Sequence, residues 1–137
     1  MFRRILVPVD FTKRNVRTVK IAAKVASSRG AALTLLHVIE RVDAGDEAAL
    51  AGFYRGLEKS ARTKMGTLLA AAGKVPTHAE IVYGNRVDEV LRLADENRAD
   101  LIVMGSHRVD RKHPGQNWGT ISYKIGILAR CPVLLVK

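Results

Sequence analysis

The stretch that decides the fold spans residues 4–30 and reads RILVPVDFTKRNVRTVKIAAKVASSRG. Its first part, residues 4–9, is a short apolar run rich in β-branched residues, which predicts a strand. Apolar residues then recur at helical spacing over residues 13–28. Thr12 stands before them as a candidate N-cap, and Gly30 follows them as a stop. The stretch therefore predicts a strand that passes directly into a helix.

The same alternation continues to the end of the chain. Strand patterns occupy residues 32–39, 77–83, 101–104 and 133–136, and helix patterns occupy residues 46–72, 86–97 and 119–129. Strict alternation implies right-handed crossovers and a parallel sheet with helices on both faces. We therefore predict an α/β fold, a single doubly wound domain over residues 1–137. The strand at 77–83 alternates polar and apolar residues and is expected at an edge, as is the last strand.

Composition narrows the class of protein. The 137 residues are 47% hydrophobic, which is typical of a folded globular domain. No apolar run approaches the ~18 residues that span a bilayer, and no signal-peptide pattern follows Met1, so we expect a cytoplasmic protein. The single cysteine, Cys131, excludes an intrachain disulfide and is expected to pack as a small buried hydrophobe. The formal net charge of +10 favours anionic partners such as nucleotides, nucleic acid or an acidic surface.

Three features are expected to meet where the parallel strands end, the usual ligand position in such sheets. Asp10 ends the first strand and acts either as a functional carboxylate or as part of a helix cap. His37 ends the second strand, where a hydrogen-bonded core imidazole is the simpler interpretation. Gly105 opens a polar loop that closes at Gly119, just before a helix. A glycine and a helix N-terminus together suit a phosphate.

Five short pieces occur in order along the chain: ILVPVD at 5–10, LHVI at 36–39, YGN at 83–85, ADLIVMGSH at 99–107 and CPVLLV at 131–136. With these pieces the chain resembles the universal stress protein family over essentially its whole length. The resemblance implies a five-stranded parallel sheet in the order 3-2-1-4-5. That order brings Asp10 and Gly105 together. The resemblance also implies a role in the stress response.

The ATP-binding branch of the family carries a motif of Gly, two residues, Gly, nine residues and Gly-Ser or Gly-Thr. Here Gly105 and Gly119-Thr120 match its outer positions, but Arg108 replaces the second glycine and ten residues, 109–118, replace the nine. The resemblance implies that Asp10 faces the ribose and that the Val38 backbone reads the adenine edge. The nucleotide-binding residues that it implies are Pro8, Val9, Asp10, Val38, Met104, Gly105, Ser106, His107, Arg108, Gly119, Thr120 and Ile121.

Arg108 can act in two ways. It disfavours the positive φ that a glycine allows and fills space meant for phosphate, or it supplies positive charge together with Arg111 and Lys112. The expected ligand is ATP or a related nucleotide, with any Mg²⁺ held by the phosphates. A protein-held metal site from His107 and His113 with Asp110 is not expected, because the spacing matches no ligand set.

Three functions from different classes remain open. The first is a homodimeric stress-response protein that pairs through its last strand and binds a nucleotide as a regulatory ligand. The second is a nucleotide-free dimeric interaction module whose pocket Arg108 and the longer loop block. The third is a polyanion-binding protein that uses a basic face of the first helix, formed by Lys13, Arg17, Lys20 and Lys24.

A solvated outer face explains those four charges more simply. Aromatic residues make up only 5% of the chain and no nucleic-acid motif is present, so nucleic acid is not the expected partner. No nucleophile elbow, kinase signature or P-loop occurs either. We therefore do not expect an enzyme, apart from the slow ATP hydrolysis that the family resemblance allows.

Overall fold

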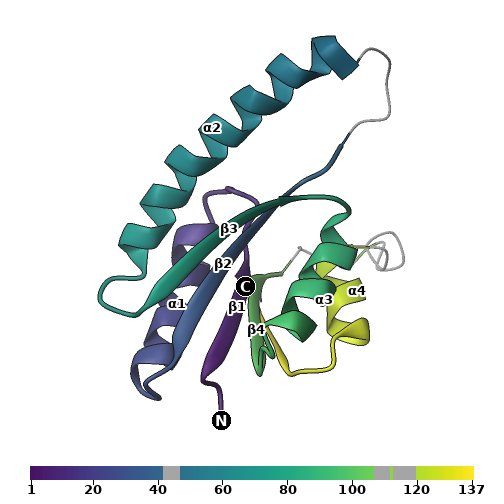
Figure 1. The fold of residues 1–137 in the computed structure, drawn as a ribbon. Helices are drawn as coiled ribbons and strands as arrows, with labels where there is room; N and C mark the ends of the chain where they lie inside the picture. The colour runs from purple at the N-terminus through teal and green to yellow at the C-terminus, as the bar shows by residue number, and fades with distance from the viewer. Residues whose placement is uncertain (42–46, 107–111, 113–119) are drawn as a thin grey trace.

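The computed structural model describes residues 1–41, 47–106, 112 and 120–137. Strands and helices alternate strictly along the chain (Figure 1), as the sequence predicts for an α/β fold. The elements are β1 (Arg4–Pro8), α1 (Asn15–Ser27), β2 (Ala32–Ile39), α2 (Glu47–Ala71), β3 (Thr77–Tyr83), α3 (Arg86–Glu96), β4 (Leu101–Gly105), α4 (Ile121–Leu128) and β5 (Val133–Val136).

The five strands form one parallel sheet in the order β3-β2-β1-β4-β5. This confirms the order that the resemblance implied, and it places β3 and β5 at the two edges. β1 lies at the centre, where it pairs with β2 on one side and with β4 on the other. Because the next strand in sequence lies to one side of β1 and the later strands lie to the other, the chain changes direction at this strand.

Apolar side chains from the sheet fill two cores, one on each face. Alternate residues of a strand point to opposite faces, so Ile5 and Val7 pack against α1 and α2, whereas Leu6 packs against α3 and α4. Most residues of β1, β2 and β4 are buried, on both faces of the sheet, as their largely apolar sequences predict. The sheet therefore holds its strand ends, and any side chain that follows them, in fixed positions.

The turn after β1 differs from the prediction. Asn15, only 4% exposed, accepts hydrogen bonds at Oδ1 from the N–H groups of Asp10 and Phe11, at 2.8 and 2.7 Å. The Asp10 carboxylate accepts the Thr12 N–H at 3.0 Å. These bonds hold residues 10–14 in a turn, so α1 begins at Asn15 rather than residue 13. The prediction of Thr12 as N-cap is wrong: Arg14 occupies that position, without a side-chain cap.

The other helix ends agree more closely with the sequence. Gly30 has a φ of +63°, which a glycine adopts easily, and it ends the segment after α1 as predicted. Thr120 is the N-cap of α4, and its side chain accepts a hydrogen bond from the Tyr123 N–H. None of the described helices is long and apolar enough to cross a membrane.

Candidate functional site

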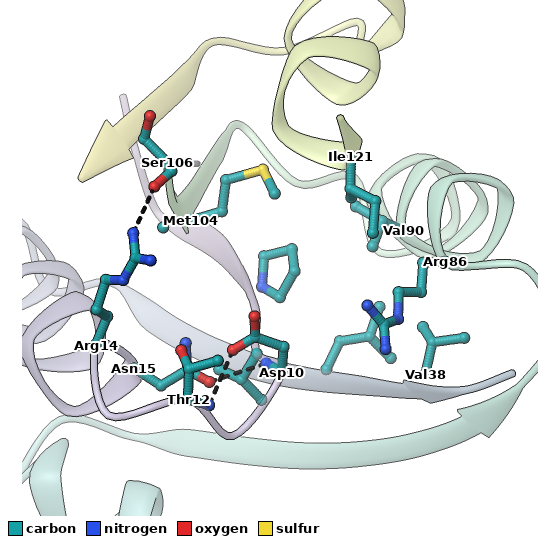
Figure 2. A pocket seen from close by; sticks show the side chains of 14 residues that line it. Asp10, Thr12, Arg14, Asn15, Val38, Arg86, Val90, Met104, Ser106 and Ile121 are labelled. Atoms are coloured by element: carbon teal, nitrogen blue, oxygen red, sulfur yellow. Dashed lines mark hydrogen bonds between the residues drawn. The ribbon is translucent and has the colours of Figure 1, made fainter. Parts of the chain in front are cut away.

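A cavity of about 160 Å³ lies where β1 and β4 end (Figure 2), at the position where the chain changes direction within the sheet. Its wall is mostly apolar, with polar groups from the turn after β1, from the start of α3 and from the end of β4. The lining residues are Pro8, Val9, Asp10, Thr12, Arg14, Asn15, Leu36, Val38, Arg86, Val90, Met104, Gly105, Ser106 and Ile121.

The cavity brings together most of the residues that the sequence singled out. Those that line it are Pro8, Val9, Asp10, Val38, Met104, Gly105, Ser106 and Ile121. Thr120 caps the helix that begins with Ile121 and does not line the cavity itself. His107, Arg108 and Gly119 lie outside the described residues, as do Asp110, Arg111 and His113. A binding role for these residues stays a prediction.

Asp10 supplies the carboxylate of the site. Burial disfavours its charged form, but hydrogen bonds from the Thr12 backbone and from the Thr12 and Asn15 side chains outweigh burial and hold the pKa of this carboxyl below its usual value. Asp10 is therefore ionised at neutral pH and can only accept hydrogen bonds. The carboxylate bonds within the turn before α1 without capping the helix, and it also faces the cavity (Figure 2). Its functional role stays a prediction.

His37 is a structural residue, as the simpler interpretation predicted. Its Nδ1–H donates to the Val9 carbonyl at 2.9 Å, and its ring packs 4.1 Å from that of Phe11. Burial lowers the pKa of His37, and the positive charges of Arg86 and Lys64 lower it further against the opposing effects of Val9 and Asp10. The neutral ring thus connects the ends of β2 and β1 behind the cavity wall.

Six lining residues were not predicted: Thr12, Arg14, Asn15, Leu36, Arg86 and Val90. Two of them bring positive charge. Arg14 Nη1 donates to the Ser106 carbonyl at 3.0 Å, and Arg86 Nε lies 3.8 Å from Glu40 Oε1. The position of Arg86 directly after the YGN piece was the one sequence feature that could have placed it at the site. Arg14 was not predicted at the site because the sequence placed it inside the first helix.

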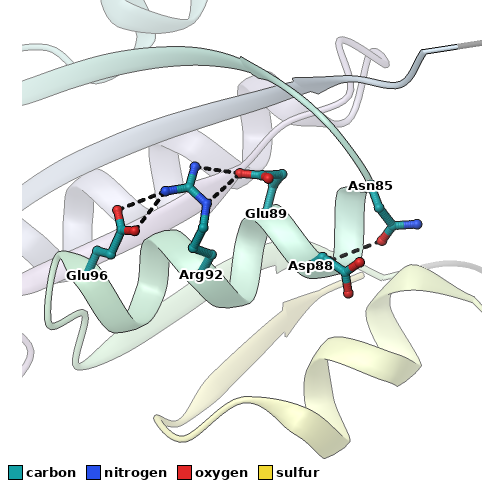
Figure 3. A network of polar contacts seen from close by, with 5 residues as sticks. All are labelled: Asn85, Asp88, Glu89, Arg92 and Glu96. Atoms are coloured by element: carbon teal, nitrogen blue, oxygen red, sulfur yellow. Dashed lines mark hydrogen bonds and ion pairs between the residues drawn. The ribbon is translucent and has the colours of Figure 1, made fainter.

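The start of α3 is fixed by local contacts. Gly84 has a φ of +146°, and a Cβ there would lie 2.8 Å from Glu89 Cγ. Asn85 caps the helix by accepting the Asp88 N–H at 3.1 Å, and Arg92 bridges Glu89 and Glu96 along the exposed face (Figure 3). These contacts hold the first turns of α3, whose residues Arg86 and Val90 form one wall of the cavity.

Cys131 lies away from the cavity, in the segment between α4 and β5. It is partly buried, not fully buried as expected, and packs at the margin of the core that contains Leu6. Burial raises the pKa of its thiol, and the charges of Asp100 and Asp95 raise it further. The thiol is therefore protonated at neutral pH. In the described ranges no group of three His, Cys, Asp or Glu residues is arranged to hold a metal ion.

Comparison with known proteins shows the family of this chain. The sequence pattern of the universal stress protein family matches residues 1–137. The chain belongs to the universal stress protein family. Universal stress protein A homolog 1 of Coxiella burnetii is 32% identical over 143 residues, covering 98% of this chain and 96% of the relative.

Solved structures share the fold of this chain. The hypothetical protein MJ0577 is 26% identical with a TM-score of 0.83, covering 100% of this chain and 96% of its own. A universal stress protein in complex with cAMP is 22% identical with a TM-score of 0.77, covering 98% and 97%. The family that five short pieces of sequence indicated is confirmed by the match over residues 1–137 and by the Coxiella relative.

Proposed function

We propose that this universal stress protein binds ATP or a related adenine nucleotide in the cavity between β1 and β4, as a regulatory ligand in the stress response. The observation that carries the proposal is the ionised Asp10 carboxylate facing an apolar cavity at the turning point of the sheet. Apolar walls suit a base, and a carboxylate accepts hydrogen bonds from ribose hydroxyls. The complex of a similar fold with cAMP supports the same class of ligand.

The size of the cavity suits part of such a ligand. Its volume of about 160 Å³ is below the roughly 300–1,000 Å³ of pockets that enclose a whole small molecule. We assign the base to the apolar side formed by Val38, Val90 and Ile121, with its edge against the Val38 backbone. The phosphates then extend towards Gly105 and Thr120. Any Mg²⁺ would arrive with the phosphates.

Nucleotide binding is tested by thermal unfolding and calorimetry with ATP, AMP and cAMP. ATP at 100 times its Kd should raise the free energy of unfolding by ~2.7 kcal/mol. Asp10→Asn keeps the size of the side chain but removes the charge, and we expect it to weaken ATP binding about tenfold. Asp88→Asn on the exposed side of α3 is the matched control. Absence of a stability increase with all three nucleotides would favour the nucleotide-free module instead.

We further propose a cytoplasmic homodimer that pairs through β5. This strand lies at an edge of the sheet, and Leu134 on it is 40% exposed. Ile127 and Leu128 of the neighbouring α4 are 61% and 57% exposed. An apolar edge strand pairs readily with another chain. Sedimentation should detect a dimer at micromolar concentration, and Leu134→Lys should dissociate it; a monomeric parent protein would contradict the proposal.

Polyanion binding is the second candidate, because the four basic residues are all exposed: Lys13 in the turn before α1, and Arg17, Lys20 and Lys24 on α1. Retention on heparin should then fall steeply with salt, since binding releases counterions. It should be lost when the four residues are neutralised and remain unchanged in Asp10→Asn. Retention without these dependences would count against this function.

A further inference from the structure

Two cations converge on one serine at the end of β4. Ser106 is 7% exposed, and its N–H donates to the Val136 carbonyl at 2.8 Å. Arg14 Nη1 donates to the Ser106 carbonyl at 3.0 Å, and Lys137 Nζ donates to Ser106 Oγ at 3.1 Å. The segment before α1 and the residue after β5 therefore bring two positive charges to the same buried residue.

Arg14 and Lys137 have no acidic partner among the described residues, where no carboxylate lies within ion-pair distance of either side chain. Arg86, the third cation of the site, differs because Glu40 faces both its Nε and its backbone N–H. Like charges gathered around a neutral serine repel one another. An anion at Ser106 would remove this repulsion.

The cavity has two distinct sides. Figure 2 shows Arg14 and Ser106 together on one side, Val38 and Arg86 on the other, and Asp10 between them. An apolar base therefore fits the Val38 side, and an anionic group fits the Ser106 side. A guanidinium has five N–H donors in a fixed plane, and the structure uses one of those of Arg14 for Ser106. A phosphate is the anion that best matches the remaining donors together with an ammonium.

We propose that Arg14 and Lys137 bind the phosphate groups of the nucleotide and make the site selective for phosphorylated ligands over nucleosides. The inference rests on the proposed nucleotide function and deepens it. Arg14 lines the cavity, and Lys137, which does not line it, reaches the lining residue Ser106 from the other strand end. The backbone at Arg14 is fixed before the ligand arrives, because the Arg14 carbonyl accepts the Thr18 N–H and hydroxyl at 3.1 and 3.2 Å, and the guanidinium is held by its bond to the Ser106 carbonyl.

The test measures the affinities of adenosine, AMP and ATP by calorimetry at one ionic strength. We expect the parent protein to bind ATP more tightly than AMP, and AMP more tightly than adenosine. Arg14→Gln and Lys137→Gln should each weaken ATP binding about tenfold, the loss typical of a charged hydrogen bond, and leave adenosine binding within about twofold. Arg29→Gln makes the same charge change at an exposed position after α1 and should leave both affinities unchanged.

Additional measurements separate ligand binding from structural support. Unfolding without ligand shows whether loss of the bond to Ser106 destabilises Arg14→Gln. Lys137→Gln tests the role in ATP binding independently, because it removes a different bond to Ser106. Each variant should also flatten the dependence of ATP affinity on salt concentration, whereas Arg14→Lys should keep it.

The possible results have distinct meanings. Equal weakening of ATP and adenosine would show that the two residues only support the fold, and unchanged ATP affinity in both variants would likewise overturn the inference. If the parent protein binds no nucleotide at all, the proposed function fails together with this inference. If the parent binds ATP and the variants bind it equally well, only the role of Arg14 and Lys137 is refuted.

Discussion

Substitution of Asn15 tests the turn that positions the candidate site. Its amide oxygen accepts the N–H groups of Asp10 and Phe11 at 2.8 and 2.7 Å, and its side chain is almost fully buried. Phe11 has a φ of +64°, in the left-handed region that non-glycine residues disfavour by ~1–2 kcal/mol. Asn15→Ala removes the acceptor from both N–H groups and with it the contacts that hold Phe11 in this conformation.

The expected loss follows from these two bonds. A donor left without a partner costs about 1–3 kcal/mol when buried. Because Asp10 is exposed and water can reach one of the two groups, the lower part of that range applies. Two N–H groups lose their acceptor, at about 1–1.5 kcal/mol each. We therefore expect Asn15→Ala to lower the free energy of unfolding by about 2–3 kcal/mol. We also expect weaker ATP binding, because the Asp10 carboxylate is no longer held against the cavity.

Urea unfolding and calorimetry measure the two effects. Asn85→Ala is the matched control: it removes an exposed N-cap and should cost about 1 kcal/mol. A loss in Asn15→Ala no greater than in Asn85→Ala would refute the role of this residue in organising the turn.

Three further perturbations test other parts of the structure. The pKa of His37 is lowered in the folded state, so its stabilising contribution is complete above about pH 6.5 and is lost as the pH falls through the lowered pKa. Between pH 7 and 5, the free energy of urea unfolding should therefore decrease less in His37→Asn than in the parent protein. Equal decreases in the two proteins would contradict this. Gly84→Ala should destabilise the protein by ~1–3 kcal/mol, because its φ is +146° and its Cβ would meet Glu89, whereas Gly56→Ala, with open space around it in α2, should add ~0.5–1 kcal/mol in the same thermal unfolding assay. Because the pKa of the Cys131 thiol is raised, iodoacetamide at pH 8 should alkylate the folded protein more slowly than the urea-unfolded protein; equal rates would show that the thiol is not protected.

Strand positions could be predicted from the sequence because each strand is a short apolar or alternating run between breaks. The observed bounds Ala32–Ile39, Thr77–Tyr83 and Val133–Val136 match the predicted ones. The start of α1 was less predictable. Several polar residues precede it, and the sequence does not reveal that the Asn15 side chain bonds backwards to Asp10 and Phe11 instead of Thr12 capping the helix.

The candidate site was predictable in part from the family resemblance, whose strand order brings Asp10 and Gly105 together. Arg14 and Lys137 could not be placed there, since their meeting at Ser106 depends on how far two long side chains extend across the sheet. Periodicity places a residue on an element and a face, but it does not state where the end of a flexible side chain lies.

The central position of β1 has a consequence for folding during synthesis. Ile5 leaves the ribosome well before its neighbour Leu101 in β4, because β2 and β3 lie between them in the sequence. One half of the sheet, β3-β2-β1, can assemble early, while the other side of β1 waits for its partner. Long-range pairing of this kind slows folding and exposes an open edge to aggregation. A nascent chain stalled before β4 should therefore require chaperone protection.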